Sequence, residues 1–359
     1  MRPLFVLLVS AVGLVLPLAA ERSTAGVTGI PGVNVKVDEA ARRVDVTVDG
    51  KPFTSYIWPD TVKKPVLYPI RDAHGTLVTR GWPLDPRPGE RVDHPHHVGF
   101  WLNYENVNGI DFWNNSDAIK PEDAPKMGTI LHRRIVSATS GERGDLVTES
   151  DWVRHDGTTL LHERTAFVFR GDAATRTIDR TTTLTALDTR VTFDDAKDGM
   201  LGLRVARQLE LPSTKPEVFT DMSGRPTEVP KLDNAGITGN YTTSDGKQGD
   251  DAWGTRGRWC LLTGQIGSDT ITIAILDHPS NPGYPTYWHA RNFGLFSANP
   301  LGQKIFSNGK ETLGFALEPK QSVTFRYRVL IVDGGLTPER ADREQKAFAQ
   351  TGAAANGRR

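Results

Sequence analysis

Alternation of apolar and polar residues over short segments constrains this chain more than any other feature. Valine occupies every second position of 44–48, and the same period of two recurs at 271–275 and 323–331. Successive side chains point to opposite faces of a strand, so this pattern is typical of half-buried β-strands. Residues 165–169 and 177–187 are rich in the β-branched and aromatic residues that strands favour.

Turn-forming pairs separate these segments, among them Asp49-Gly50 and Asn308-Gly309. Helical periodicity is scarce, and one helix is predicted, starting near Thr337 with a proline in its first turn. Many short strands joined by turns predict an all-β fold, a large antiparallel β-sandwich with a short C-terminal helix.

The chain contains no internal repeat and no glycine-serine linker, so one sandwich domain is predicted over residues 21–352. Residues 213–251 are dense in Pro, Gly, Asp, Asn and Thr, and we interpret them as a long loop or insertion over the sandwich. Residues 353–359 are small and basic and are predicted to form a disordered tail.

Residues 1–20 have the pattern of a secretory signal peptide. Met1-Arg2 supplies a positive start, residues 4–18 are almost wholly apolar, and Ala19-Ala20 offers small residues for cleavage. This apolar run is shorter than the ~20 residues needed to cross a bilayer, and no later stretch is apolar enough to do so. We therefore expect a secreted or periplasmic protein without stable membrane insertion.

The charge balance argues against a nucleic-acid partner. The 43 Lys and Arg residues equal the 43 Asp and Glu residues, so the formal net charge is zero. Nucleic-acid binders need a basic surplus to displace counterions from phosphates. A small molecule or an oligosaccharide is the expected partner.

Three of the nine histidines fall within one short run, Asp93-His94-Pro95-His96-His97. If this run is extended, His94 and His96 lie on one face and His97 on the other. We interpret it as a candidate catalytic centre in which Asp93 orients a histidine; the alternative is a loop whose imidazoles only bind backbone carbonyls. Large aromatic and acidic side chains that follow closely are predicted to contact substrate: Trp101, Asp111 and Trp113.

A second concentration of polar residues lies far downstream. His289 and Arg291 are two positions apart, so on a strand they place a proton carrier beside a permanent cation. Lys197 and Arg204 belong to a third segment, and Asn299 follows the second. Apart from His289, these residues are predicted to bind substrate; the alternative is an ordinary charged sheet surface.

The runs 93–99, 108–113, 197–204 and 288–300 resemble, in order, motifs of the bacterial PmoA-like family. The resemblance extends over about residues 68 to 332. The family is named after a methane oxygenase subunit, a multi-span helical protein, and a chain without spanning helices does not suit that role. Its members resemble secreted bacterial proteins encoded among sugar-degrading functions, which implies a carbohydrate setting. Val98 stands where many relatives carry Arg.

The leading hypothesis is a secreted carbohydrate-active enzyme with glycoside hydrolase-like acid–base chemistry. Epimerisation and elimination remain open as alternatives to cleavage of a glycosidic bond. Sugars present apolar faces to aromatic rings and hydroxyls to polar groups. His96, His97 and His289 are the predicted proton carriers, because histidine titrates near neutral pH. The implied fold resembles the supersandwich of aldose mutarotase-like enzymes. Two carboxylates are usual in glycosidases, and the candidates are Asp93, Asp111, Glu163, Asp198 and Asp277.

Two other hypotheses remain open. One is a metal-dependent hydrolase or oxygenase, in which His94, His96 and His289 join a carboxylate to bind a transition metal. The other is a non-catalytic glycan-binding protein, since stacking aromatics suit binding equally well. No nucleotide-binding motif occurs, and the leading hypothesis needs no cofactor.

Overall fold

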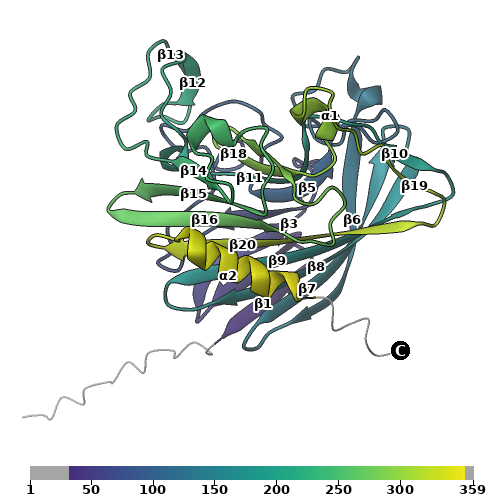
Figure 1. Cartoon of the computed structure of the whole chain (residues 1–359), viewed down its shortest axis with the longest axis horizontal. Coiled ribbons are helices and arrows are strands. Elements are labelled where there is room, and N and C mark those ends of the chain that lie inside the picture. The colour runs from purple at the N-terminus through teal and green to yellow at the C-terminus, as the bar shows by residue number, and fades with distance from the viewer. Residues whose placement is uncertain (1–31, 352–359) are drawn as a thin grey trace, which may run out of the picture.

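Two antiparallel sheets of eight strands each face one another in the computed structural model, which describes residues 32–351 (Figure 1). The first sheet has the order β1 (Val33–Asp38), β2 (Arg43–Val48), β3 (Lys51–Ile57), β4 (Val66–Ile70), β5 (Phe100–Tyr104), β11 (Gly199–Arg204), β18 (Leu295–Asn299) and β17 (Tyr287–Ala290). The second sheet has the order β14 (Asn240–Thr243), β15 (Trp259–Ile266), β16 (Asp269–Asp277), β20 (Ser322–Asp333), β9 (Thr175–Ala186), β8 (Thr159–Gly171), β7 (Gly144–Arg154) and β6 (Gly128–Thr139). Apolar side chains of both sheets form one continuous core between them. This is the predicted antiparallel sandwich.

Shorter elements complete the described residues. Two small sheets pair β10 (Val191–Phe193) with β19 (Phe315–Leu317), and β12 (Glu217–Thr220) with β13 (Pro226–Val229). The α-helices are α1 (Gln303–Phe306) and α2 (Pro338–Ala349), and short 3₁₀ helices cover Ala124–Lys126, Arg207–Leu209 and Gly249–Ala252. The predicted signal peptide, 1–20, and the predicted tail, 353–359, lie outside the described residues.

The alternating segments form the expected half-buried strands. In β2, Val44, Val46 and Val48 point into the core and are at most 1% exposed, while the residues between them are partly exposed. Burying an aliphatic side chain is worth roughly 1.5–3 kcal/mol. A slip of one residue would move the whole set of valines to the outer face, so the hydrophobic pattern determines the register.

Strand β16 departs from simple alternation because both of its faces are buried. Its three isoleucines face the core between the sheets, whereas Ala274 and Leu276 pack with Phe348 of α2 in a second apolar cluster. Helix α2 covers the outer face of the second sheet (Figure 1). It begins where predicted, since the Thr337 side chain accepts a hydrogen bond from the Arg340 N–H (3.3 Å).

Residues 213–251 are not a bare loop. They contain the β12–β13 hairpin and β14, which is an edge strand of the second sheet. Asp221 Oδ1 closes the hairpin turn by accepting from the N–H groups of Ser223 (2.8 Å) and Arg225 (3.0 Å), and Gly224 supplies a φ of +84°. Some of the residues that suggested a long loop or insertion therefore close a short hairpin.

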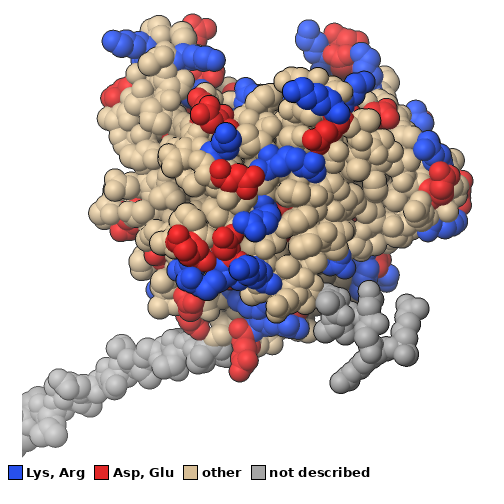
Figure 2. Space-filling model, viewed as in Figure 1, with Lys and Arg blue, Asp and Glu red and all other residues tan. Residues whose placement is uncertain are grey.

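Charges of both signs are interspersed on the face of the molecule seen in Figure 2. Many of them pair, as in the contacts of Arg258 with Asp342 (3.1 Å) and Arg256 with Glu311 (2.9 Å). This face therefore carries no continuous basic patch of the kind that nucleic-acid binders use. Between residues 32 and 351, the helices are too short and too polar to span a bilayer.

A polar network is buried within the second sheet. Glu163 on β8 accepts hydrogen bonds from Trp152 Nε1 (2.8 Å) and Thr165 Oγ1 (2.6 Å), and it pairs with Arg180 of β9 (3.2 Å). Glu163 and Arg180 are 5% and 4% exposed. Glu163 was a candidate catalytic carboxylate, but its partners assign it a structural role.

We expect Glu163→Ala to lower the free energy of unfolding by about 3–5 kcal/mol, because it leaves the buried Arg180 guanidinium unpaired. Urea unfolding followed by circular dichroism measures this change. Glu318→Ala is the matched control, since Glu318 pairs with Arg190 on the surface (2.9 Å). Its loss should cost less than about 1 kcal/mol. Equal effects of the two substitutions would contradict this role of Glu163.

Asp277, another candidate carboxylate, is buried at the end of β16. Its side chain accepts hydrogen bonds from the N–H groups of His278 (3.0 Å) and Thr286 (2.8 Å) and from Asn281 Nδ2 (2.7 Å). These bonds anchor the loop that leads to β17. Burial raises the pKa of Asp277 from its usual 3.8 to about 7, against the opposing effect of these hydrogen bonds.

This raised pKa predicts a pH-dependent stability. Between about pH 4 and pH 7 the unfolded state has lost the Asp277 proton while the folded state retains it. Stability should therefore fall as pH rises, by about 1.4 kcal/mol per pH unit, and level off above the folded pKa. Urea midpoints measured across this range should show the slope in the wild type and not in Asp277→Asn. The same slope in both proteins would refute the assignment to Asp277.

Candidate active site

Three histidines gather in a tight turn rather than in an extended segment. The His97 N–H donates to the His94 carbonyl (2.9 Å), which closes a turn with Pro95 at its second position. The ring centroids of His94 and His96 lie 4.8 and 4.3 Å from that of His97. The extended geometry considered for 93–97 is therefore wrong, because the fixed φ of proline also suits the first corner of a turn.

Arg80, a buried residue between β4 and β5, holds this turn together. Its guanidinium donates to the carbonyls of Asp93 (2.8 Å), His94 (3.0 Å) and His97 (3.1 Å), and it forms an ion pair with the Asp93 carboxylate. Arg204, the last residue of β11, donates to the same carboxylate oxygen (2.6 Å). Burial opposes ionisation of Asp93, but the Arg204 charge, the His94 hydrogen bond and the Arg80 charge hold its pKa well below the usual range.

His94 is the histidine of the turn that faces solvent, with a side chain 43% exposed. Its Nδ1 lies 2.7 Å from Asp93 Oδ2. An ionised carboxylate can only accept, so Nδ1 carries the proton and Nε2 is free to accept another. Its φ of +43° lies in the left-handed region, where a non-glycine residue is strained by of order 1–3 kcal/mol. Strain of this kind gathers at functional sites.

A second wall comes from the β17–β18 hairpin. The Gly294 N–H donates to the Arg291 carbonyl (3.0 Å), and Gly294 has a φ of +86°, so the two strands are joined by a tight turn. Phe293 in this turn stacks parallel to His94, with ring centroids 5.0 Å apart. His289 on β17 and Arg291 just after it are two positions apart and line the same cavity.

The third wall precedes β11 and carries Lys197 and Asp198. Asn299 on β18 donates through Nδ2 to the carbonyls of Ala196 and Lys197 (2.9 Å each), and its Oδ1 accepts from the Leu301 N–H (3.1 Å). Asn299 is fully buried. It therefore positions the backbone that presents Lys197 and Asp198.

Together with Trp113 and Asn114, the three segments line one cavity of about 160 Å³, which we call the His cavity. Its lining consists of His94, His96, His97, Trp113, Asn114, Lys197, Asp198, His289, Arg291, Phe293 and Leu295. Because β5, β11, β18 and β17 are neighbours in the first sheet, segments far apart in the sequence meet at this point.

Four of the predicted substrate contacts lie outside this lining: Trp101, Asp111, Arg204 and Asn299. Trp101 is fully buried and stacks beneath His97, with ring centroids 5.4 Å apart. Asp111 accepts from the N–H groups of Trp113 (2.8 Å) and Asn114 (2.9 Å). These residues lie behind the lining, and their role as substrate contacts stays a prediction.

His97 is buried with both ring nitrogens occupied. The Trp113 indole N–H donates to His97 Nε2 (3.2 Å), and Arg204 Nη1 lies 3.1 Å from Nδ1. Burial, followed by the charges of His96 and Arg204, lowers the pKa of His97 well below its usual value. A buried, neutral imidazole suits a positioning role, and the role of His97 as a proton carrier stays a prediction.

His96 and His289 are also held neutral. Burial, with Lys64 as the next cause, lowers the pKa of His96 to about 2. Burial, with Arg291 as the next cause, lowers the pKa of His289 well below its usual value. Neutral imidazoles accept or donate one hydrogen bond at each nitrogen, so both suit ligand binding better than proton uptake.

Asp198 is the carboxylate among the described lining residues. His289 Nδ1 lies 3.4 Å from Asp198 Oδ1, and Lys197 Nζ lies 3.4 Å from Oδ2. Burial raises the pKa of Asp198, against the opposing charge of Lys197. A carboxyl group with a raised pKa can serve as a general acid. The other carboxylates proposed from the sequence lie outside the lining: Asp93, Asp111, Glu163 and Asp277.

The metal site considered from the sequence does not assemble. Within the described part of the chain, one group of at least three His, Cys, Asp or Glu ligand atoms lies within 4.8 Å of one another, and it is Asp72, His74 and Asp333. His94, His96 and His289 line the His cavity without forming such a group.

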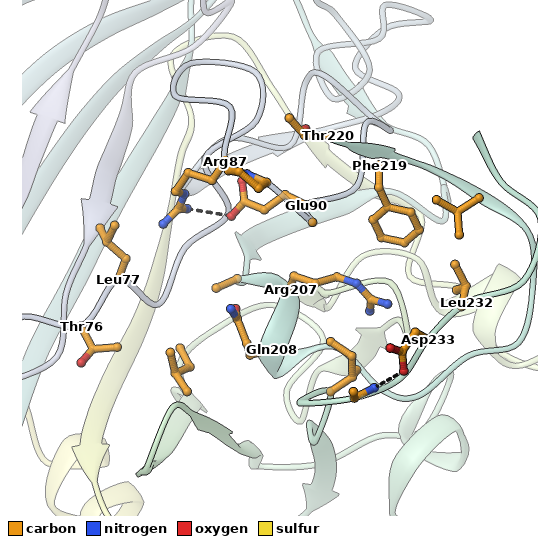
Figure 3. A pocket seen from close by; sticks show the side chains of 17 residues that line it. Thr76, Leu77, Arg87, Glu90, Arg207, Gln208, Phe219, Thr220, Leu232 and Asp233 are labelled. Atoms are coloured by element: carbon orange, nitrogen blue, oxygen red, sulfur yellow. Dashed lines mark hydrogen bonds and ion pairs between the residues drawn. The ribbon is translucent and has the colours of Figure 1, made fainter. Parts of the chain in front are cut away.

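A larger cavity of about 550 Å³ lies beside the β12–β13 hairpin (Figure 3). Arg87 in its lining pairs with Glu90 (2.9 Å), and Arg207 pairs with Glu210 just outside it (2.8 Å). The guanidinium carbons of Arg91 and Arg207 lie 5.3 and 4.8 Å from the Phe219 ring centroid. This cavity was not anticipated from the sequence, and none of the described residues that line it is a histidine.

Sequence reasoning missed three parts of the site: the turn-holding Arg80, and the lining residues Asn114 and Phe293. No motif pointed to Arg80, because an isolated arginine in a loop is expected to be exposed to solvent. Asn114 directly follows Trp113, and Phe293 lies two positions after Arg291 within the run 288–300. Their closeness to these residues was the available signal.

Comparison with known proteins identifies a family, but it does not identify an activity. No curated protein matches the chain. A β-arabinopyranosidase structure aligns with 85% of this chain at 12% identity and a TM-score of 0.27, and the chain spans 40% of that protein's length. A galactose mutarotase-like protein from Clostridium acetobutylicum aligns with 84% of this chain and 98% of its own at 9% identity and a TM-score of 0.34.

Structural similarities of this strength carry no argument about activity. The resemblance to the PmoA-like family stays a prediction. Residues 43–346, most of the chain, match a family described as being of unknown function. The chain therefore belongs to that family, DUF6807.

Proposed function

We propose that the protein is an enzyme that performs acid–base chemistry on a small carbohydrate in the His cavity, with hydrolysis of a glycosidic bond as the leading case. The observation that carries this proposal is a solvent-facing imidazole, His94, oriented by the ionised Asp93, in the same small cavity as the protonatable Asp198. The predicted export of the chain belongs to the same proposal.

The two groups have different roles. Asp93 keeps the proton of His94 on Nδ1, so Nε2 acts as the base that takes a proton from water or a sugar hydroxyl. Burial raises the pKa of Asp198, so this carboxyl is the group that donates a proton to the leaving glycosidic oxygen. In hydrolysis the water oxygen bonds to the anomeric carbon while the bond to the leaving oxygen breaks, so one proton is taken up and one is released.

The remaining lining suits one sugar ring. The cavity of about 160 Å³ is smaller than the ~300–1,000 Å³ of pockets that enclose drug-sized ligands. Phe293 and Trp113 offer apolar ring surface to the C–H face of a sugar. Lys197, Arg291 and Asn114 offer donors to its hydroxyls, and the neutral His289 offers a ring nitrogen.

A panel of aryl glycosides, oligosaccharides and free sugars tests the proposal. Released aryl groups report hydrolysis, and proton NMR of the free sugars reports isomerisation by the same acid–base pair. Binding without turnover, seen by calorimetry, would favour a glycan-binding protein. Neither turnover nor binding across the panel would overturn the proposal.

Substitution of the two acid–base residues should lower kcat by about 10²–10⁴-fold each. For Asp198→Asn the reason is loss of the acid, and for His94→Ala it is loss of the base. In the wild type, kcat/KM should fall as pH rises through the pKa of Asp198, because the ionised carboxylate no longer donates a proton. Because burial raises the pKa of Asp198, this fall in kcat/KM should occur at a higher pH than an exposed carboxyl would give. The Asp198→Asn variant should not show the fall.

His155→Ala is the matched control, because His155 is exposed in the turn between β7 and β8. It should retain wild-type kcat and KM, and thermal unfolding of all variants checks that each is folded. If kcat/KM of Asp198→Asn falls with rising pH as it does in the wild type, another group is the acid.

A further inference from the structure

A second cluster of polar groups lies away from the His cavity, where strands of the two sheets end close together. Asp72 follows β4 of the first sheet, His74 lies two residues further on, and Asp333 is the last residue of β20 in the second sheet. Their ligand atoms all lie within 4.8 Å of one another. His74 Nδ1 is 3.2 Å from Asp333 Oδ2.

Three carboxylate oxygens of this cluster lack hydrogen-bond donors. Asp72 is 1% exposed; its Oδ1 accepts from the N–H groups of His74 (3.0 Å) and Thr76 (2.7 Å), but its buried Oδ2 accepts none from the described residues. The Asp333 side chain is 8% exposed, and both of its oxygens are likewise without a hydrogen bond. Buried acceptors without donors are costly, and two carboxylates that face each other also repel.

The nearby guanidinium does not satisfy these oxygens. Arg176 Nη1 donates to the carbonyls of Asp172 (2.5 Å) and Thr175 (3.0 Å), and Nη2 donates to the carbonyl of Ala73 (3.4 Å). Its hydrogen bonds thus go to the backbone rather than to the carboxylates of Asp72 and Asp333. The cluster still lacks a group that can coordinate all three free oxygens at once.

We propose that Asp72, His74 and Asp333 bind one divalent cation of the zinc class. Two carboxylates and one imidazole form a donor set that Zn²⁺ accepts, with water in a fourth position. Ca²⁺ and Mg²⁺ prefer six or more oxygen ligands and suit the imidazole poorly. The cation supplies the positive charge that the free oxygens lack, and it enters past His74, whose side chain is 56% exposed.

The bound cation links the two sheets, because its ligands follow β4 on one side and end β20 on the other. It therefore acts as a structural cross-link between elements that are distant in the sequence. This role is independent of the chemistry proposed for the His cavity, which shares no residue with the cluster.

Calorimetric titration of chelator-treated full-length protein with ZnCl₂ tests the proposal, together with the thermal unfolding midpoint. The wild type should bind one Zn²⁺, and Tm should rise by about 4 °C at a hundredfold excess over Kd. His74→Ala should weaken binding by at least about tenfold, and Asp333→Asn should abolish it. His74 is largely exposed, so its variant is expected to fold.

Asp269→Asn, an exposed aspartate at the start of β16, is the matched control and should bind Zn²⁺ as the wild type does. A CaCl₂ titration should give weaker binding. Zinc affinity that is equal in the wild type, His74→Ala and Asp333→Asn would place the ion elsewhere and overturn the proposal. The proposal would also be overturned if the wild type shows no saturable Zn²⁺ binding and Asp333→Asn is more stable than the wild type. In that case the carboxyl groups of Asp72 and Asp333 would share a proton instead of a cation.

Discussion

The ion cluster formed by Arg80, Asp93 and Arg204 is the interaction on which the rest of the candidate site depends. Two buried guanidiniums converge on one carboxylate oxygen, and Arg80 also donates to the carbonyls of the histidine turn. Removing one partner from a buried cluster of this kind typically costs 3–5 kcal/mol. The same charges keep Asp93 ionised, so that His94 carries a defined tautomer and a free Nε2.

The first sheet carries the candidate site, and the second sheet contributes much of the core packed against it. Strands β5, β11, β18 and β17 lie side by side, so chain segments that are distant in the sequence meet over one small cavity. The second sheet contributes long strands whose inner faces complete the shared core. Its buried polar residues, such as Glu163 and Asp277, are fully hydrogen-bonded and have no contact with the cavity.

The two polar clusters of the molecule differ in whether their buried charges are compensated. Beside the His cavity the buried Asp93 carboxylate pairs with Arg80 and Arg204, and burial, followed by neighbouring cations, lowers the pKa of His96 and of His289. At Asp72 and Asp333, buried oxygens face each other without a donor. The first arrangement is suited to moving protons on a bound ligand, and the second to holding a cation.

The sequence by itself determined the strand class, the hydrophobic register of strands such as β2, the start of α2 at Thr337, and the runs that carry the site. Each of these depends on local periodicity or capping, which neighbouring residues encode. The sequence could not reveal that residues 213–251 contain a hairpin, because the same turn-forming residues occur in loops and in hairpins.

Only the tertiary structure decided which side chains of those runs face a cavity and which lie beneath it. Trp101 and Trp113 carry the same chemistry and lie twelve residues apart, yet one is packed under His97 and the other lines the cavity. Solvent exposure followed the same rule: His94 is exposed beside the Asp93 carboxylate, whereas His97 is buried beside Trp113 and Arg204. The physical reason is that burial and charge neighbours come from strands distant in the sequence, and these set the environment of each group.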